Sequence, residues 1–321
     1  MAIRRIGILT AGGDAPGMNS CIRGLVRYGL NSKLEVMGIF RGWYGLINEE
    51  LKLLSHRSVS GIINLGGTML KTARCAEFKA EEGQRRAFET VKKNAIDALV
   101  VIGGDGSFRA AREFYKKYKV SCIGIPASID NDINGIDVTI GSDTAINTAL
   151  YALDNIRDTA TSMERIFVVE VMGRSSGYIA LQVALAGGCE EVIIPERSPD
   201  LGKICHDIVQ GNLRGKISWI IIVAEGAARA AEVAEKINQM TGLETREIVL
   251  GHIQRGGRPT AFSRTLALTL AQAAVDCLLS GKTDMAVGLK DGRIIEIDLE
   301  FAIKKKDLPV DKLYNLIKIL T

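Results

Sequence analysis

Aromatic side chains are scarce in this chain. They make up 5% of its 321 residues, whereas hydrophobic residues in total make up 47%. The apolar content therefore comes mainly from Ala, Ile, Leu and Val, which is typical of α/β proteins with buried parallel strands. A chain of this length and hydrophobic content can bury a large core, and we expect two domains.

Cysteine and histidine lack the spacings that disulfide frameworks and metal sites need. The six cysteines form no C-x-x-C pair, and the three histidines lie far apart in the sequence. These patterns argue against a disulfide-stabilised secreted domain and against a zinc site. We expect the cysteines to be small buried residues in a reducing compartment.

Strong net charge and long apolar runs are also missing. The 41 basic and 37 acidic residues leave a net charge of +4, which predicts neither a nucleic-acid nor a membrane partner. The N-terminal segment has only a few apolar residues before a glycine turn, unlike a signal peptide, and no run approaches the ~20 apolar residues of a membrane span. We therefore expect a soluble cytoplasmic protein.

Apolar and amphipathic segments alternate along the chain. Continuous apolar runs, as at 96–104 and 218–226, favour strands covered on both faces. The alternation predicts parallel sheets with right-handed crossovers. Strands are predicted at 4–10, 34–40, 96–104, 120–126, 166–173, 190–196, 218–226 and 246–251 and as a hairpin in 285–299, with helices at 17–30, 104–118, 142–161, 175–186, 201–214, 228–241 and 260–280.

Glycine-rich or polar breaks follow these apolar runs. In parallel α/β sheets ligands bind beyond the carboxyl ends of the strands, so the breaks contain the candidate site residues. Two of them, GGDAPG at 12–17 and GGDGS at 103–107, are glycine turns before helices, a pattern that suits phosphate binding. Neither is a Walker A or G-x-G-x-x-G motif. Asp105 could hold a Mg²⁺ that bridges phosphates, whereas Asp14 could simply shape its turn.

Two aspartates, Asp130 and Asp132, follow the strand at 120–126. Aspartate is an ordinary turn residue, but a carboxylate at a strand end can also act as a general base. Glu225 could accept hydrogen bonds from sugar hydroxyls, and His252 could donate to a phosphate or hydroxyl. Guanidinium groups near strand ends suit phosphate oxygens, and such arginines are Arg74, Arg165, Arg174, Arg246 and Arg255. These features together indicate phosphoryl transfer from a nucleotide to a phosphorylated small molecule, with Asp130 as the best candidate for the base.

Five motifs give the chain a specific resemblance over essentially its whole length. GILTAGGDAPGMN, GGDGS, PASIDND, VEVMGR and LGHIQRGG occur in the order and spacing of the bacterial 6-phosphofructokinase family. The resemblance implies ATP-dependent phosphorylation of fructose 6-phosphate at its 1-hydroxyl with Mg²⁺. It also implies a homotetramer with active sites shared between subunits.

The resemblance implies two unequal Rossmann-like α/β domains with mainly parallel sheets and the active site in the cleft between them. The larger, nucleotide-binding domain would comprise 1–141 and 258–305. The smaller, sugar-phosphate-binding domain would comprise 142–257 and 306–321.

The family's functional residues map onto this sequence motif by motif. Asp130 would be the base for the sugar hydroxyl, beside the other catalytic residues Ser128, Asp132 and Arg174. ATP would contact Gly13, Arg74, Cys75, Gly104, Asp105, Gly106 and Ser107, with Asp105 holding the metal. Fructose 6-phosphate would contact Ser128, Ile129, Asp130, Met172, Gly173, Arg174, Glu225, His252, Ile253, Gln254 and Arg255, and a neighbouring subunit would add Arg165 and Arg246.

An effector site for ADP or phosphoenolpyruvate is also implied. The matching residues are Arg23, Arg27, Arg157, Gly188, Glu190, Arg214 and Lys216, whereas His56, Arg57, Ile217 and Ser218 depart from the family's pattern. Other departures are Ser128 in place of threonine, Cys75 in place of an aromatic residue and Ala127 in place of glycine.

Three other readings compete with an ATP-dependent enzyme. They are a diphosphate-dependent phosphotransferase of the same fold, a kinase for a related sugar phosphate, and a nucleotide sensor without turnover. Diphosphate-dependent enzymes of the family tend to carry a second aspartate in the GGDG turn and a lysine at the position of Ala127. Gly106 and Ala127 match neither feature. The retained aspartates Asp105, Asp130 and Asp132 argue against a sensor.

Overall fold

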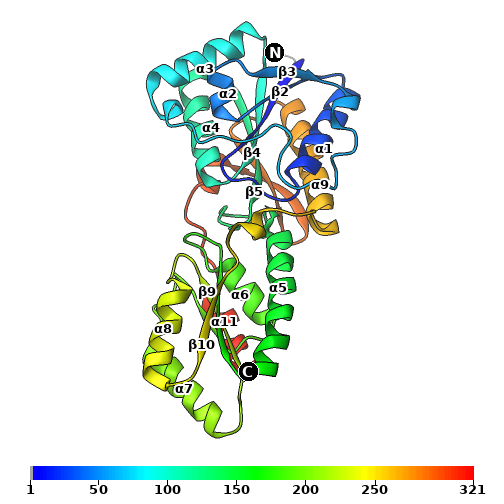
Figure 1. Ribbon diagram of the computed structural model, residues 1–321. Helices are drawn as coiled ribbons and strands as arrows, with labels where there is room; N and C mark the ends of the chain where they lie inside the picture. The colour runs from blue at the N-terminus through cyan, green and yellow to red at the C-terminus, as the bar shows by residue number, and fades with distance from the viewer. Residues whose placement is uncertain (1–2) are drawn as a thin grey trace. The chain divides into compact units, whose positions relative to one another are not determined.

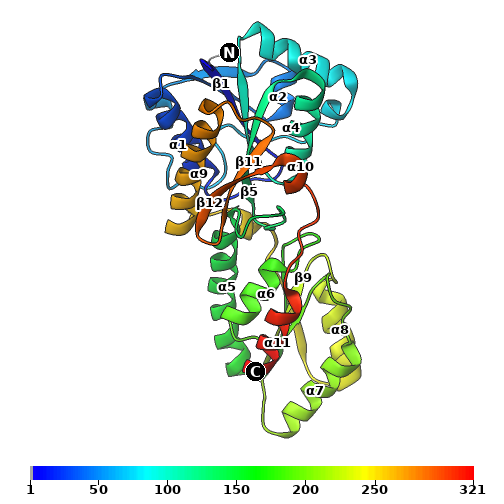
Figure 2. The same ribbon diagram turned by 180° about the vertical axis from the view of Figure 1, so that it is seen from behind.

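A computed structural model describes residues 3–321, which divide into two compact units (Figures 1 and 2). The larger unit contains the chain up to Thr144 together with Arg255–Lys306, and the smaller unit contains Ala145–Gln254 and Asp307–Thr321. The chain thus changes units after residues 144, 254 and 306, where the sequence had placed the changes after 141, 257 and 305. Both units are α/β with mainly parallel sheets, as predicted.

The larger unit is built on an eight-stranded sheet. The path through the sheet is β12-β11-β5-β4-β1-β2-β3, with β6 paired to β5, and only the β2–β3 and β11–β12 pairs are antiparallel. The central strand β4 is buried along its whole length, which explains its uninterrupted apolar sequence. The strands are β1 (Arg5–Ala11), β2 (Glu35–Ile39), β3 (Leu51–Leu54), β4 (Ala98–Gly103), β5 (Ser121–Ser128), β6 (Ile140–Gly141), β11 (Met285–Lys290) and β12 (Arg293–Asp298).

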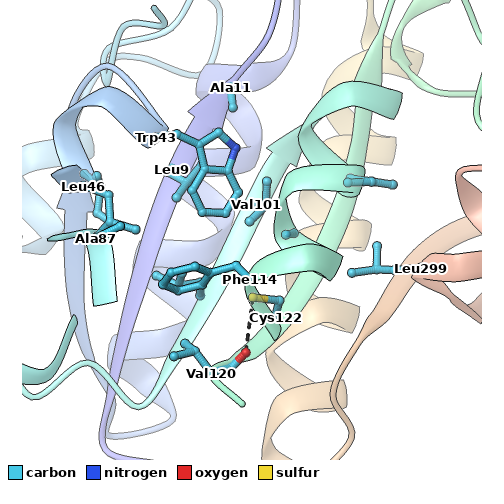
Figure 3. Close-up of a cluster of buried hydrophobic side chains, with 14 of the residues drawn as sticks. Leu9, Ala11, Trp43, Leu46, Ala87, Val101, Phe114, Val120, Cys122 and Leu299 are labelled. Carbon is cyan, nitrogen blue, oxygen red and sulfur yellow. Dashed lines mark hydrogen bonds between the residues drawn. The ribbon is translucent and has the colours of Figure 1, made fainter. Parts of the chain in front are cut away.

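Helices cover both faces of this sheet. Helices α1 and α9 pack against each other, and α9 packs on β5. The core on the other face gathers around Trp43, whose ring lies 6.0 Å from that of Phe114 (Figure 3). The Trp43 ring also stacks on that of Phe78, with centroids 4.2 Å apart. The helices are α1 (Met18–Asn31), α2 (Trp43–Ile47), α3 (Glu81–Lys93), α4 (Asp105–Tyr118), α9 (Ala261–Leu279) and α10 (Leu299–Ala302), with short 3₁₀ turns η1 (His56–Val59) and η2 (Glu77–Lys79).

The smaller unit contains a four-stranded, wholly parallel sheet in the order β10-β7-β9-β8. Helices α7 and α8 cover one face through a core that includes Ile208, Ile221 and Ile237. Helix α6 packs on β8 and β9, and α11 packs on α6. The elements are α5 (Ser142–Met163), which begins just before the unit does, β7 (Ile166–Val171), α6 (Tyr178–Ala186), β8 (Glu191–Ile193), α7 (Leu201–Leu213), β9 (Trp219–Ala224), α8 (Ala230–Thr241), β10 (Thr245–Val249), η3 (Gly251–Arg255) and α11 (Val310–Leu320).

Several elements were not predicted from the sequence. Helix α3 was missed because it has few large apolar residues: its buried face consists of Gly83, Gln84, Ala87, Thr90 and Val91. The short elements α2, β3 and α10 and the C-terminal α11 were also missed.

Helix α9 is the element most similar to a membrane span in length and composition. Among the described residues it is the one helix that is long and apolar enough to cross a membrane by length and composition. Polar residues interrupt its sequence, so it contains no long uninterrupted apolar run. Half of its most apolar window is buried, and it packs against α1 and β5 as a core helix.

Most of the cysteines confirm the expectation of small buried residues. All six are free, and five of them are buried. Burial raises the pKa of the Cys21 and Cys122 thiols well above the usual range, which keeps both unreactive.

Candidate functional site

The carboxyl ends of three neighbouring strands meet at one edge of the larger sheet. β4 pairs in parallel with both β1 and β5. The glycine turn 12–17 follows β1, the glycine turn 103–107 includes the end of β4, and the aspartate loop follows β5. The structure therefore brings together three segments that are spread over more than a hundred residues of the chain.

Glycine lets these segments approach one another. A Cβ atom at Gly103 would lie 2.5 Å from the carbonyl oxygen of Ala11 and 2.6 Å from Oγ of Ser107. A Cβ atom at Gly12 would lie 3.3 Å from the same hydroxyl oxygen. Ser107 thus lies between the two turns, and its position depends on the absence of a side chain at residue 103. Helix α4 begins at this point, and the free backbone N–H groups at its N-terminus favour binding of an anion.

Arg255 lies beside the first glycine turn. Its Nη1 is 3.4 Å from the carbonyl oxygen of Asp14, and a Cβ atom at Gly13 would collide with the guanidinium group. The residue belongs to the larger unit, whereas the neighbouring His252, Ile253 and Gln254 belong to the smaller one. A guanidinium over a glycine turn adds positive charge to a cradle that suits phosphate.

The aspartate loop is shaped by Asn131. This residue has a positive φ of 50°, and its Nδ2 donates to the carbonyl oxygen of Asp137 over 2.8 Å. At the start of the loop the Asp130 amide lies 3.3 Å from Oγ of Ser128, and Oγ1 of Thr139 donates to the carbonyl of Ser128. Asp130 is 3% exposed, so this residue is buried within the same turn that Asn131 shapes.

Lys306 contacts the same loop, and sequence reasoning did not find it. Its Nζ lies 3.4 Å from the Asp137 carbonyl oxygen that also accepts from Asn131. Burial lowers the pKa of Lys306 to about 8, although the negative charges of Asp137 and Asp132 oppose this shift. The sequence marks it only as one of three consecutive lysines before the last helix.

A further glycine-containing segment, 65–71, was also missed. The Asn19 side chain, 3% exposed, donates to the carbonyls of Leu65 and Gly66 and accepts from the amide of Met69 over 2.7 Å. Thr10, the penultimate residue of β1, donates to the Lys71 carbonyl over 2.9 Å. Helix α1 and strand β1 therefore fix the segment that leads to Arg74 and Cys75.

Arg74 and Cys75 lie in irregular structure between this segment and η2. Cys75 is partly exposed and packs against the core cluster that contains Trp43 and Phe78. Burial raises the pKa of its thiol above the ordinary value, so it serves as a small apolar contact.

Asp105 begins helix α4 and forms an ion pair with Arg109, whose Nε lies 3.0 Å from Oδ1. The described residues contain no group of three or more His, Cys, Asp and Glu side chains that could hold a metal. Mg²⁺ in phosphoryl-transfer sites needs only one or two carboxylates, because water and phosphate oxygens complete its shell. A single carboxylate next to the glycine turns fits that requirement once Arg109 moves aside.

In the smaller unit, Glu225 organises the loop after β7. Its Oε1 accepts from the amides of Gly173 (3.3 Å) and Arg174 (2.9 Å). Arg174 has a positive φ of 52°, and Gly226 leaves room for the Arg174 carbonyl, with which any Cβ would collide. Glu225 is therefore a loop anchor through one oxygen, which adds to its expected role as a hydrogen-bond acceptor for sugar hydroxyls.

The remaining residues of this edge follow β7 and β10. Met172 is 6% exposed and precedes the loop, while His252, Ile253 and Gln254 lie in η3. Gln254 is fully buried and donates to the carbonyl of Gly251 over 3.2 Å, whereas Ile253 is 57% exposed.

Arg165 and Arg246 lie at the opposite edge of the same sheet. Arg165 precedes β7, and Arg246 is the second residue of β10. Strands of five and six residues span about 17–20 Å, so this pair lies roughly that far along the sheet from Arg174 and His252. Within the smaller unit of a single chain, Arg165 and Arg246 therefore lie at the other end of the strands from Arg174 and His252.

The effector-pattern residues fall into two groups. Arg23 and Arg27 are on α1 of the larger unit, where Nη1 of Arg23 donates to the Val59 carbonyl over 2.9 Å. In the smaller unit, Arg157 donates to the carbonyls of Gly187 and Gly188. Lys216 forms an ion pair with the buried Glu190 over 3.0 Å, and Arg214 follows α7.

Comparison with known proteins assigns the chain to a family. The family model described as Phosphofructokinase matches residues 5–278, and the chain belongs to that family. An ATP-dependent 6-phosphofructokinase of Clostridium botulinum strain Hall is 50% identical over 319 residues, which cover 99% of this chain and 100% of the relative. The enzyme with the same description from Thermotoga petrophila is 47% identical over the same shares of the two chains.

Solved structures agree with this fold. A phosphofructokinase of Saccharomyces cerevisiae superposes with a TM-score of 0.90 and 34% identity over 99% of this chain, which spans 48% of the yeast chain. A pyrophosphate-dependent phosphofructokinase from Marinobacter aquaeolei has a TM-score of 0.86 and 23% identity, covering 99% of this chain and 91% of the other. At that identity the second comparison shows the fold alone.

The environment of Lys306 predicts a pH-dependent effect on stability. Burial lowers the pKa of Lys306 from 10.5 to about 8, so below pH 8 the folded state carries a costly buried charge. Above pH 8 the folded lysine loses its proton while the unfolded lysine still keeps it, so the cost of the charge falls as the pH rises. We expect Lys306→Met to raise the free energy of unfolding at pH 7, with a gain that shrinks as the pH rises towards 10. Urea unfolding at both pH values measures this.

Lys305→Met is the matched control, since Lys305 is an exposed neighbour with the same charge. A gain for Lys306→Met that is the same at both pH values, or one that the control reproduces, would contradict the assignment.

Proposed function

We propose that this phosphofructokinase-family protein transfers the terminal phosphoryl group of ATP to the 1-hydroxyl of fructose 6-phosphate, giving fructose 1,6-bisphosphate and ADP. The observation that carries the proposal is the meeting of two glycine turns and an aspartate loop at one edge of the larger sheet. The relatives described as ATP-dependent 6-phosphofructokinases, half identical over the whole chain, support the donor and the acceptor.

The larger unit would bind the donor. The backbone of Gly13 and of residues 104–107 would surround the phosphates, with positive charge from Arg74 and packing from Cys75. Asp105 would hold Mg²⁺, which neutralises charge on the donor phosphates when bound. Arg255, beside the first turn, would touch both the donor and the sugar phosphate.

Asp130 would act as the general base. As the sugar oxygen forms its bond to the terminal phosphorus, the bond from that phosphorus to the bridging oxygen of ATP breaks, and the hydroxyl proton passes to the Asp130 carboxylate. The turn at Asn131, next to Asp130, would help to position this carboxylate. Ser128 and Asp132 would flank the transferring group, and Arg174 would stabilise its negative charge.

The smaller unit would bind the sugar phosphate. Glu225 orients the Gly173–Arg174 backbone with one carboxylate oxygen, which leaves the other for a sugar hydroxyl. Residues 252–254 and Met172 would complete these contacts. Ile129 would contribute from the aspartate loop.

Arg165 and Arg246 would serve the site of a neighbouring subunit in a homotetramer. Their place at the edge of the sheet opposite to Arg174 supports this assignment, because one chain then presents the two groups of arginines on different sides. ADP or phosphoenolpyruvate would bind at the effector-pattern residues, where Glu190 and Lys216 already form a pair. A reducing, cytoplasmic setting agrees with the six free thiols.

Asp130→Asn tests the base assignment. The amide cannot accept the proton, so kcat should fall by about 10²- to 10⁴-fold, while KM for both substrates changes little. A coupled assay of fructose 1,6-bisphosphate formation gives both constants. Asp137→Asn, whose amide oxygen can still accept from the Asp291 amide, should keep its turnover. Turnover near the wild-type rate in Asp130→Asn would overturn the assignment.

Gly106→Asp tests the donor site. A Cβ atom at Gly106 meets nothing within 4 Å, and an acidic residue in the first turn of α4 suits the helix dipole, so the variant should fold. Its carboxylate would repel the donor phosphates, and we expect KM for ATP to rise by about tenfold or more. The neutral isostere Gly106→Asn should raise KM much less. Equal effects of the two substitutions would show that charge at this position does not matter.

A further inference from the structure

Glu244 binds both of the arginines at the amino-terminal edge of the smaller sheet. Its Oε2 lies 2.9 Å from Nε of Arg165, and its Oε1 lies 2.5 Å from Nη2 of Arg246. One carboxylate therefore uses a different oxygen for each guanidinium group. Glu244 was not among the site residues predicted from the sequence.

The backbone fixes this arrangement. β7 and β10 are parallel neighbours with Thr245 opposite Ile166, which puts Glu244 alongside Arg165. The Ile166 amide donates to the Glu244 carbonyl over 3.3 Å. Glu244 and Arg246 are two residues apart at a strand end, so their side chains extend from the same face of the sheet. The three charged groups thus meet because of the sheet register and not by chance approach of flexible loops.

The cluster is accessible and carries surplus positive charge. The side chains of Glu244 and Arg246 are 48% and 57% exposed, and that of Arg165 is 24% exposed. Burial acts to raise the pKa of Glu244, but hydrogen bonds from both arginines prevail and lower it, so the carboxylate is ionised at neutral pH. Two cations share one anion, which leaves a net charge of +1 before any ligand binds.

We propose that Glu244 is a displaceable counter-ion that sets the affinity of Arg165 and Arg246 for a phosphate monoester dianion. The proposal rests on the proposed function, in which these arginines bind the phosphate of the sugar. The N–H groups that a phosphate would use are the ones that Glu244 occupies. Exposed ion pairs are weak, so a dianion with three acceptor oxygens can displace the carboxylate. The carboxylate also screens the pair, which disfavours ligands with a single negative charge.

Glu244→Gln tests the proposal because it removes the charge and keeps the size of the side chain. With the competitor weakened, KM for fructose 6-phosphate should fall by about two- to tenfold, whereas kcat and KM for ATP stay the same. The fall should be larger at low ionic strength, because the net charge of the cluster rises from +1 to +2. Glu247→Gln is the control: Glu247 is an exposed carboxylate on β10 that forms no ion pair among the described residues.

Unchanged or weaker use of fructose 6-phosphate by Glu244→Gln would overturn the proposal and would show that Glu244 only supports the arginines. Absence of wild-type turnover would instead refute the proposed function. In that case calorimetric titration of the wild-type protein and of Glu244→Gln with inorganic phosphate tests the counter-ion role. Tighter binding by Glu244→Gln supports the counter-ion role, and equal or weaker binding refutes it.

Discussion

Close packing at the carboxyl edge of the larger sheet is the constraint on which the candidate site depends. The carbonyl of Ala11 and the hydroxyl of Ser107 leave no space for a side chain at Gly103. Only with glycine there can the turns after β1 and β4 lie side by side, with the start of α4 facing the same space. The aspartate loop joins them because β5 is the next strand of the sheet. The proposed donor cradle and the proposed general base thus come together through the order of the strands and the absence of a side chain at Gly103.

The sequence predicted most of the regular structure and the residues of this edge. Uninterrupted apolar runs identify strands that are buried on both faces, and the rule that ligands bind at carboxyl ends selects the turns. Helix α3 escaped because its buried face has few large apolar side chains. The segment 65–71 escaped because its place is set by Asn19 and Thr10, which reach it from elements far away in the sequence. Such tertiary hydrogen bonds leave no periodic signal in the sequence.

The arginines show a different limit of sequence reasoning. Proximity to a strand end, the criterion applied to the sequence, does not say which end of the strand is meant. Arg174 follows β7 and Arg165 precedes it, so the length of one strand separates two residues that looked equivalent in the sequence. Glu244 was overlooked for a related reason, since its pairing with both arginines follows from the register of β7 against β10. Glu225, by contrast, was found, but its hydrogen bonds to the Gly173–Arg174 backbone became visible only in the fold.

The central claim is that the open glycine turns accept a nucleotide as phosphoryl donor. The most direct measurement is a coupled assay with fructose 6-phosphate in which ATP and inorganic diphosphate are supplied separately with Mg²⁺. The account predicts turnover with ATP and a kcat/KM for diphosphate that is lower by about tenfold or more, equivalent to at least ~1.4 kcal/mol in transition-state stabilisation. Faster turnover with diphosphate, or no turnover with either donor, would contradict it.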